Sequence, residues 1–202
     1  MVERRQHFGS LVRLIGVSLK IDLALVEEAS SDSEALERLI AHVWPEAFRL
    51  AAGILRDRSL AEDAAQEACA SMAVALSSLK SAASFRTWFY RLVVNESISI
   101  SRRRRDTVAL HEITSKTIEF DGAQAVDLFG ALQRLSSEQR AIVLLHYYAG
   151  LNSRELAAAA GLPAATVRFH LMLARRALRR ALSLAAHAAP PEVYSNANRP
   201  AH

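Results

Sequence analysis

The chain has 202 residues, 51% of them hydrophobic, and its 25 Lys and Arg against 21 Asp and Glu give a formal net charge of +4. This length allows one or two small domains with a sizeable apolar core. A single cysteine excludes an internal disulfide and cannot build a zinc site by itself. No apolar run reaches the roughly 18 residues of a membrane span, so we expect a cytoplasmic protein without membrane insertion. Few Gly and Pro beside frequent Ala and Leu predict an all-α fold.

Residues 1–31 carry no firm structural signal. Apolar residues recur there at helical spacing, at Leu11, Leu14, Ile15 and Leu19. The segment is a short amphipathic helix, a poorly ordered extension, or in part untranslated because the true start codon lies downstream. A signal peptide is not expected, because charges interrupt the apolar region and no small-residue cleavage site follows promptly. From Asp32 to Asp57 the helical periodicity is firm, with a break or kink expected at Trp44–Pro45.

The stretch from Ser59 to Leu79 predicts an amphipathic helix. Ser59 with Glu62 three residues later has the spacing of a capping box, which marks a helix start. One stripe of this helix is apolar, and the opposite stripe offers Asp63, Gln66 and Glu67 to a partner. On spacing alone, an ordinary solvated helix face is the favoured interpretation.

Aromatic and basic residues are interleaved in the next helix. Its sequence S-F-R-T-W-F-Y-R, over residues 84–91, is followed by four consecutive arginines at 102–105. Aromatic rings stack on unpaired bases and arginines bind phosphates, so the pattern suits strand-separated nucleic acid. A core helix whose arginines extend to solvent explains it equally well.

Residues 107–124 lose the helical period and are predicted to be an interdomain linker. Helical spacing resumes over 125–184, where Asn152 and Glu155 form a capping-box variant, Gly161 supplies a turn and Pro163 fits the first position of the next helix. This order predicts a helix-turn-helix. Five arginines and no acid over 163–182 are typical of a DNA-binding helix, with a solvated basic helix as the alternative. We expect 185–202 to be a mobile tail.

Taken together, these motifs resemble a known family. The pattern D-x-x-Q-E from Asp63, followed by S-F-R-T-W-F-Y-R, Asn95 and the arginine run, resembles region 2 of bacterial RNA polymerase sigma factors. The helix-turn-helix resembles region 4 of the same proteins, and the group most similar is the small extracytoplasmic-function type. The resemblance implies two small helical domains, a region 2-like bundle over 32–106 and a region 4-like helix-turn-helix domain over 125–184, joined by a flexible linker.

The resemblance also implies a function. The chain would be a promoter-specificity subunit that binds core RNA polymerase, recognises the −10 and −35 promoter elements and helps melt DNA. It would not be an enzyme, and no catalytic residue, cofactor or metal is expected. The implied partners are the β′ clamp helices and the β flap of polymerase, promoter DNA and an anti-sigma factor.

Three sets of site residues follow from their positions in the family's motifs. The set for binding core polymerase is Asp63, Gln66 and Glu67. The set for −10 binding and melting is Phe85, Arg86, Trp88, Arg91, Asn95, Arg102 and Arg103. The set for −35 binding is Ser153, Arg154, Ala165, Thr166, Arg168, Phe169, His170, Met172, Arg175 and Arg176.

The chain departs from the family's pattern within these motifs. Cys69 and Ala73 stand where the family usually has Phe and Trp, and Ser99 takes the place of an Asp used at the −10 element. In the last helix, Ser, Arg and Arg are replaced by Phe169, His170 and Leu173. Helical geometry places Phe169 away from the buried stripe, so we expect it to contact a thymine methyl group. The alternative is that it packs on polymerase or on an inhibitory partner.

Two other functions account for parts of the sequence. A helix-turn-helix repressor or activator that does not need core polymerase would explain 150–182. It would leave the acidic face at 63–67 and the aromatic cluster at 85–91 unexplained. An enzyme such as a helical nuclease is disfavoured, because the sequence has no carboxylate pair at metal spacing near the arginines, no Cys/His cluster and no Gly-rich phosphate loop.

Overall fold

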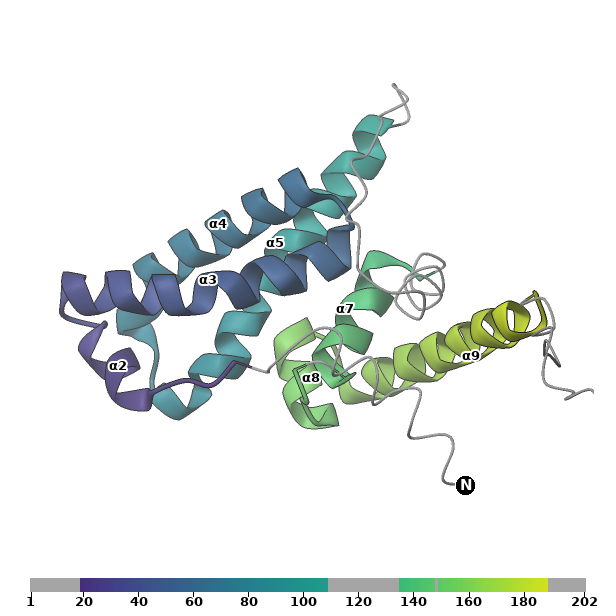
Figure 1. Cartoon of the computed structure of the whole chain (residues 1–202). Coiled ribbons are helices and arrows are strands. Elements are labelled where there is room, and N and C mark those ends of the chain that lie inside the picture. The colour runs from purple at the N-terminus through teal and green to yellow at the C-terminus, as the bar shows by residue number, and fades with distance from the viewer. Residues whose placement is uncertain (1–18, 109–134, 148, 189–202) are drawn as a thin grey trace, which may run out of the picture.

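The computed structural model describes residues 19–108, 135–147 and 149–188, which form helices joined by short turns, with no strand in those ranges (Figure 1). In chain order the helices are α2 (Leu23–Glu28), α3 (Ser33–Leu55), α4 (Arg58–Ala75), α5 (Phe85–Val108), α7 (Ser137–Tyr147), α8 (Ser153–Ala160) and α9 (Ala164–Ala188). Two short 3₁₀ turns, Leu76–Ser78 and Ala82–Ser84, connect α4 to α5. The predicted all-α fold is confirmed.

An aspartate begins α4 two residues earlier than predicted. Asp57 Oδ1 accepts a hydrogen bond at 3.2 Å from the backbone N–H three residues further on, which makes Asp57 the N-cap. Ser59 lies inside the helix, so the capping box predicted there is wrong. The reason is that Arg56 adopts a left-handed conformation (φ 62°) that ends α3 and leaves Asp57 to start the next helix at once. Glu62, the other half of the predicted box, instead pairs with Arg58 at 3.0 Å.

Helix α3 continues through the break expected at Trp44–Pro45. A proline inside a helix removes a backbone hydrogen bond and costs about 3 kcal/mol or more. Pro45 itself is exposed, whereas Val43 and Ala47 on either side of it are fully buried. Packing before and after the proline therefore holds the helix together, and this is a tertiary effect that local propensity does not reveal.

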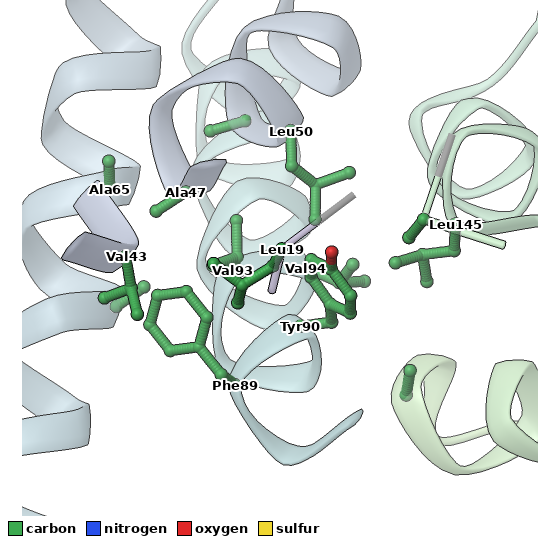
Figure 2. Close-up of a cluster of buried hydrophobic side chains, with 14 of the residues drawn as sticks. Leu19, Val43, Ala47, Leu50, Ala65, Phe89, Tyr90, Val93, Val94 and Leu145 are labelled. Carbon is green, nitrogen blue, oxygen red and sulfur yellow. The ribbon is translucent and has the colours of Figure 1, made fainter. Parts of the chain in front are cut away.

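The main apolar core lies between α3, α4 and α5. Phe85, Phe89 and Tyr90 of α5 have no exposed surface. Figure 2 shows the Phe89 ring between Val43 of α3 and Val93 of α5. The apolar stripe predicted for α4 is confirmed, since the buried residues of this helix include Ala65, Ala68 and Met72. Its small alanine side chains let α4 lie close to its neighbours.

Helices α8 and α9 form the predicted helix-turn-helix. Asn152 Oδ1 accepts hydrogen bonds from the backbone N–H groups of Arg154 (2.9 Å) and Glu155 (3.1 Å), and the Glu155 carboxylate accepts from the Asn152 N–H (2.8 Å). The predicted capping box is therefore confirmed. Gly161 ends α8 with φ 64°, a conformation that favours glycine. The chain bends by 101° between the two helices, as usual for this motif. On α9 the predicted buried stripe is confirmed at Val167, Leu171 and Ala174.

The chain before residue 32 takes part in the fold from Leu19 onward. Leu19 and Val26 are buried, with 9% and 3% of their surfaces exposed. His42 Nε2 lies 2.7 Å from the carbonyl oxygen of Lys20, which ties this segment to α3. The predictions for residues 1–18, for the linker beyond residue 108 and for the tail beyond residue 188 lie outside the described residues. The domain bounds at 32, 106, 125 and 184 stay predictions.

The two groups of helices are packed directly against each other. Helices α7 and α8 contact α3 and α5, whereas α9 extends away from that contact (Figure 1). Leu145 of α7 has no exposed surface and faces Tyr90 and Val94 of α5 (Figure 2). The two helical domains therefore share buried surface.

Candidate polymerase-binding and nucleic-acid-binding surfaces

The predicted polymerase-binding residues lie together on the outer side of α4. Asp63, Gln66 and Glu67 are exposed, because the opposite side of the helix is buried against α3 and α5. Within the part of the chain that the structure describes, neither carboxylate forms an ion pair. The same stripe continues to Val74, which is 86% exposed. This α4 face, defined by Asp63, Gln66, Glu67 and Val74, offers two unpaired carboxylates, an amide and an apolar end to a partner.

The aromatic residues predicted for −10 binding differ in exposure. The Phe85 ring is fully buried, stacks on Phe89 with centroids 5.7 Å apart and is tilted against Trp88 at 5.9 Å. Trp88 is half-buried. The structure thus places Phe85 in the core beneath Trp88, where a base cannot reach it. Phe85 was predicted to contact DNA from its position in the family's motif, and that position does not show which way the ring faces.

Arg86 connects the start of α5 to the loop before α8. Its guanidinium donates a hydrogen bond to the carbonyl oxygen of Ala149 and lies 5.7 Å from the centroid of the Tyr90 ring. The Tyr90 hydroxyl donates to Glu46 Oε1 at 2.8 Å, and both of these side chains are buried. Burial raises the pKa of the Tyr90 phenol to about 12, and the Glu46 carboxylate adds to the rise. Arg86 is therefore part of a contact between the two domains in this arrangement.

The other residues predicted for −10 binding are exposed along α5. Arg91 and Asn95 lie one turn apart, and Ser99 follows one turn later. Arg102 and Arg103 are exposed further along the helix. This α5 face, made of Arg91, Asn95, Ser99, Arg102 and Arg103, presents guanidinium, amide and hydroxyl donors to solvent. Such donors suit phosphates and base edges.

Two arginines that sequence analysis did not single out have structural roles. Arg104 Nη1 lies 3.3 Å from an Asp57 carboxylate oxygen, and both side chains are largely buried. Arg140 Nε donates a hydrogen bond at 2.7 Å to the carbonyl oxygen of Ile54. These partners lie 47 and 86 residues away along the chain. No local pattern distinguishes such arginines from those available to DNA.

The residues predicted for −35 binding lie on the outer side of the helix-turn-helix. Phe169 and Met172 are each 54% exposed. Other exposed members of the set are Ser153, Arg154, Ala165, Arg168, Arg175 and Arg176, whereas Thr166 and His170 are half-buried. Arg175 Nε donates to the Tyr147 hydroxyl at 2.8 Å, which ties this arginine to α7. The surface combines basic residues with two large apolar side chains.

The structure brings no metal-binding set together in the described ranges. No group of three or more His, Cys, Asp or Glu side chains there could hold an ion. Burial raises the pKa of the Cys69 thiol to about 11, so this side chain is not a reactive thiolate at neutral pH. No single helix among the described residues is long and apolar enough to cross a membrane. The chemistry that these surfaces offer is recognition by charge, hydrogen bonding and apolar contact.

Comparisons with known proteins match the same two parts of the chain. Residues 39–107 match the family described as Sigma-70 region 2, and residues 126–178 match the family described as Sigma-70, region 4. The RNA polymerase sigma-H factor of Pseudomonas aeruginosa is 26% identical over 182 residues, which cover 80% of this chain and 93% of that protein. The ECF RNA polymerase sigma factor SigM of Mycobacterium tuberculosis is 29% identical over 163 residues, which cover 78% and 82%.

Solved structures show the same fold. The sigma factor RpoE in complex with the anti-sigma factor NepR from Bartonella quintana has a TM-score of 0.61 at 21% identity, covering 73% of this chain and 96% of that one. CnrH in complex with the cytosolic domain of CnrY has a TM-score of 0.59 at 21% identity, covering 81% and 97%. Both sigma-70 family models match this chain, and the sigma-factor relatives are matched over most of their length. The chain therefore belongs to the sigma-70 family of promoter-recognising RNA polymerase sigma factors, as a member of the extracytoplasmic-function type.

Proposed function

We propose that this sigma factor uses three surfaces in transcription initiation. The α4 face binds the β′ clamp helices of core polymerase, the α5 face holds the opened −10 element, and the helix-turn-helix reads the −35 element and meets the β flap. The observation that carries the proposal is the exposed, unpaired acidic stripe of α4 beside a basic and aromatic α5. For a regulator that only bound DNA, that stripe would be no more than a solvated helix face.

Electrostatics supports α4 as the surface that docks on polymerase. Asp63 and Glu67 lie one turn apart on the helix and attract a basic protein surface. Since neither carboxylate pairs with another residue in the described ranges, docking breaks no ion pair of the free chain. Val74 adds an apolar contact at the far end of the same stripe.

The α5 helix suits a strand that has been opened. The accessible part of the Trp88 ring can stack on an unpaired base, and Phe85 supports that ring from the core. Arg91, Asn95 and the arginines at 102 and 103 can then contact phosphates and base edges along the same side. Arg86 can join them only after its hydrogen bond to the carbonyl of Ala149 is broken.

On the helix-turn-helix, Phe169 is the residue that would make the −35 preference unusual. Its side chain is more than half exposed on the outer side of α9. A phenyl ring cannot donate a hydrogen bond to guanine, but it can contact a thymine methyl in the major groove. We therefore propose a T-rich patch beneath Phe169. Fewer arginines than the family pattern also predict a weaker dependence of DNA binding on salt.

An anti-sigma factor completes the proposed set of partners. Of the solved structures named above, the sigma factor RpoE from Bartonella quintana is bound to an anti-sigma factor, and CnrH is bound to the cytosolic domain of CnrY. The exposed apolar side chains of Phe169 and Met172 would give an inhibitor a contact area on region 4. The place of action would be the cytoplasm, which contains the polymerase and the promoters.

Charge reversal on α4 tests the docking assignment. Glu67→Lys should weaken binding to core polymerase roughly tenfold, and Gln66→Lys added to it should weaken binding further, because each change puts a positive charge on a face proposed to attract a basic surface. Glu37→Lys is the matched control, since Glu37 is an exposed glutamate on α3. Affinity is measured by titrating labelled sigma factor with core enzyme, and helix content and melting are checked for each variant.

Equal affinities for the Glu67 and Glu37 variants would refute α4 as the docking face. A second measurement separates the proposal from an independent helix-turn-helix regulator. Promoter DNA binding should require core polymerase, whereas an independent regulator binds equally well without it.

A further inference from the structure

A cavity of about 410 Å³ lies where α7 meets the end of α3, the start of α4 and the later part of α5. Its volume falls within the range of small-molecule sites, about 300–1,000 Å³. Two arginines, three serines and three leucines line it, and no acidic side chain does so in the described ranges. None of these residues belongs to the sets predicted to bind polymerase or promoter DNA. The cavity is therefore a candidate for a site of another kind.

The two arginines of the cavity come from different helices, and their neighbours hold them in place. Arg104 of α5 extends Nη1 to 3.3 Å from Asp57 Oδ2. Arg140 of α7 donates from Nε to the carbonyl oxygen of Ile54 at 2.7 Å and from Nη1 to that of Leu135 at 2.6 Å. A guanidinium has five N–H donors, so some of them can orient the group while others bind a ligand. Held in this way, both groups are preorganised for an anion.

The surroundings of the cavity carry a net positive charge. Arginine stays charged at physiological pH. Arg104 lies beside Asp57, and the neighbouring Arg102 lies 3.7 Å from Glu138 on the first turn of α7. With Arg140, three guanidiniums against two carboxylates leave one positive charge in excess. An anion in the cavity would offset that excess.

The start of α7 adds to the positive potential. Ser136 caps this helix, because its Oγ accepts a hydrogen bond from the Gln139 N–H at 3.2 Å and its own N–H donates to Gln139 Oε1 at 3.0 Å. Ser136 and Ser137 both line the cavity, so the first turn of α7 borders it. The first N–H groups of a helix lack partners within it and carry its partial positive charge, which favours phosphate. Ser101 of α5 adds a hydroxyl to the lining.

An apolar wall distinguishes this cavity from a site for a bare ion. Leu55 and Leu135 are 9% and 4% exposed, and Leu60 is half-buried. The cavity has more than ten times the roughly 30 Å³ that a water molecule occupies in the liquid, so a lone phosphate ion would leave much of it to water. An organic group attached to the phosphate would cover the leucines and remove their apolar surface from water.

We propose that this cavity binds a small phosphate monoester. The phosphate group lies between Arg104, Arg140 and the start of α7, where it accepts charge-assisted hydrogen bonds, and the organic group contacts the three leucines. A monoester phosphate carries a charge of about −1.5 to −2 at pH 7, which suits two guanidiniums better than the single charge of a nucleic-acid phosphate. This inference goes beyond the proposed function and does not depend on it, because other residues form the three surfaces used in transcription initiation.

Titration of the full chain with phenyl phosphate tests the site. This compound joins a phosphate monoester to a small apolar ring, and inorganic phosphate is the matched probe without the ring. Binding is measured by calorimetry and by the shift in Tm. A hundredfold excess of phenyl phosphate over its Kd should raise Tm by about 5–10 °C. Inorganic phosphate should bind about tenfold more weakly, because it leaves the leucines uncovered.

Arginine variants test where the probe binds. Arg140→Gln and Arg104→Gln should each weaken the binding of phenyl phosphate about tenfold, because each removes charge-assisted hydrogen bonds to the phosphate. Arg38→Gln is the control, since Arg38 lies on α3 in an exposed ion pair with Glu28, away from the cavity lining. This control should keep its affinity within about twofold of wild type.

A variant that keeps both arginines makes the test independent of their structural roles. Arg104→Gln also removes a partner of Asp57, which lowers stability. Ser101→Leu instead places a larger side chain at a half-buried position of the lining. It should fill part of the cavity and weaken the binding of phenyl phosphate at least about tenfold, with the arginines unchanged.

Each other result overturns the proposal. Phenyl phosphate that does not bind wild-type protein saturably, or that binds the arginine and serine variants as tightly as wild type, excludes the cavity as its site. Equal affinity for inorganic phosphate overturns the assignment to an ester. A single-stranded oligonucleotide that displaces phenyl phosphate would show that the cavity belongs to a nucleic-acid surface, which overturns the assignment to a small molecule.

Discussion

Replacing two adjacent aromatic residues by leucine should separate support of the core from contact with DNA. Phe85 is fully buried and Trp88 is half-buried, and their rings lie 5.9 Å apart. Phe85→Leu keeps most of the apolar volume but loses the stacking on Phe89, so the free energy of unfolding should fall by about 1–2 kcal/mol. Trp88→Leu should lower stability by a similar amount, of order 1–2 kcal/mol, because part of that ring is already exposed.

The two variants should differ in strand opening. Stacking of an aromatic ring on an unpaired base is worth about 1–3 kcal/mol, so Trp88→Leu should lower open-complex formation on duplex promoter about 5- to 150-fold. A template with a pre-melted bubble should restore part of the lost activity. Phe85→Leu, corrected for the fraction of folded protein, should stay within about twofold of wild type because its ring does not reach a base.

Stability is measured by chemical denaturation, and strand opening by the reactivity of unpaired thymines in complexes with core polymerase. Equal opening defects in both variants would mean that the two rings act only through the core. A normal opening rate for Trp88→Leu would remove Trp88 from the −10 surface.

Changing Phe169 to Ser together with His170 to Arg should shift the −35 sequence selected from a promoter library, and an unchanged preference would show that Phe169 does not contact bases. Alkaline pH should destabilise the fold, because the pKa of Tyr90 is raised from 10.0 to about 12 and the unfolded chain loses that proton first. The contribution of the Tyr90 phenol to the free energy of unfolding is fully present below pH 10 and falls by up to about 3 kcal/mol towards pH 12. Tyr90→Phe should remove this part of the loss of stability, as measured by denaturation curves at each pH. Leu19→Ala should lower the free energy of unfolding by about 2 kcal/mol, because Leu19 is buried. Leu23→Ala, the control, alters a side chain that is 47% exposed and should lower it by under about 1 kcal/mol. Equal losses for the two variants would exclude Leu19 from the core.

Most features encoded over one or two helical turns could be predicted from the sequence, although the capping box predicted at Ser59 was wrong because Asp57 begins α4. The capping box at Asn152, the turn at Gly161 and the buried stripe of α9 are all present in the structure. The apolar and polar stripes of α4 were equally predictable, because helical periodicity assigns each residue a side before any tertiary contact forms. The two sigma-factor domains were indicated by the resemblance of motifs such as D-x-x-Q-E from Asp63 to the family's pattern, and not by periodicity alone.

The partner of each arginine and the direction of each ring depended on tertiary structure. Phe85 and Trp88 stand three residues apart among the same neighbours, yet one fills the core and the other reaches the surface. Arg86 and Arg140 bind carbonyl groups 63 and 86 residues away, and no pattern in the chain distinguishes them from arginines that face solvent. The physical reason is that a guanidinium can find hydrogen-bond acceptors, and a ring can find apolar contacts, in several environments. Only the packing of distant helices decides which of these environments it meets.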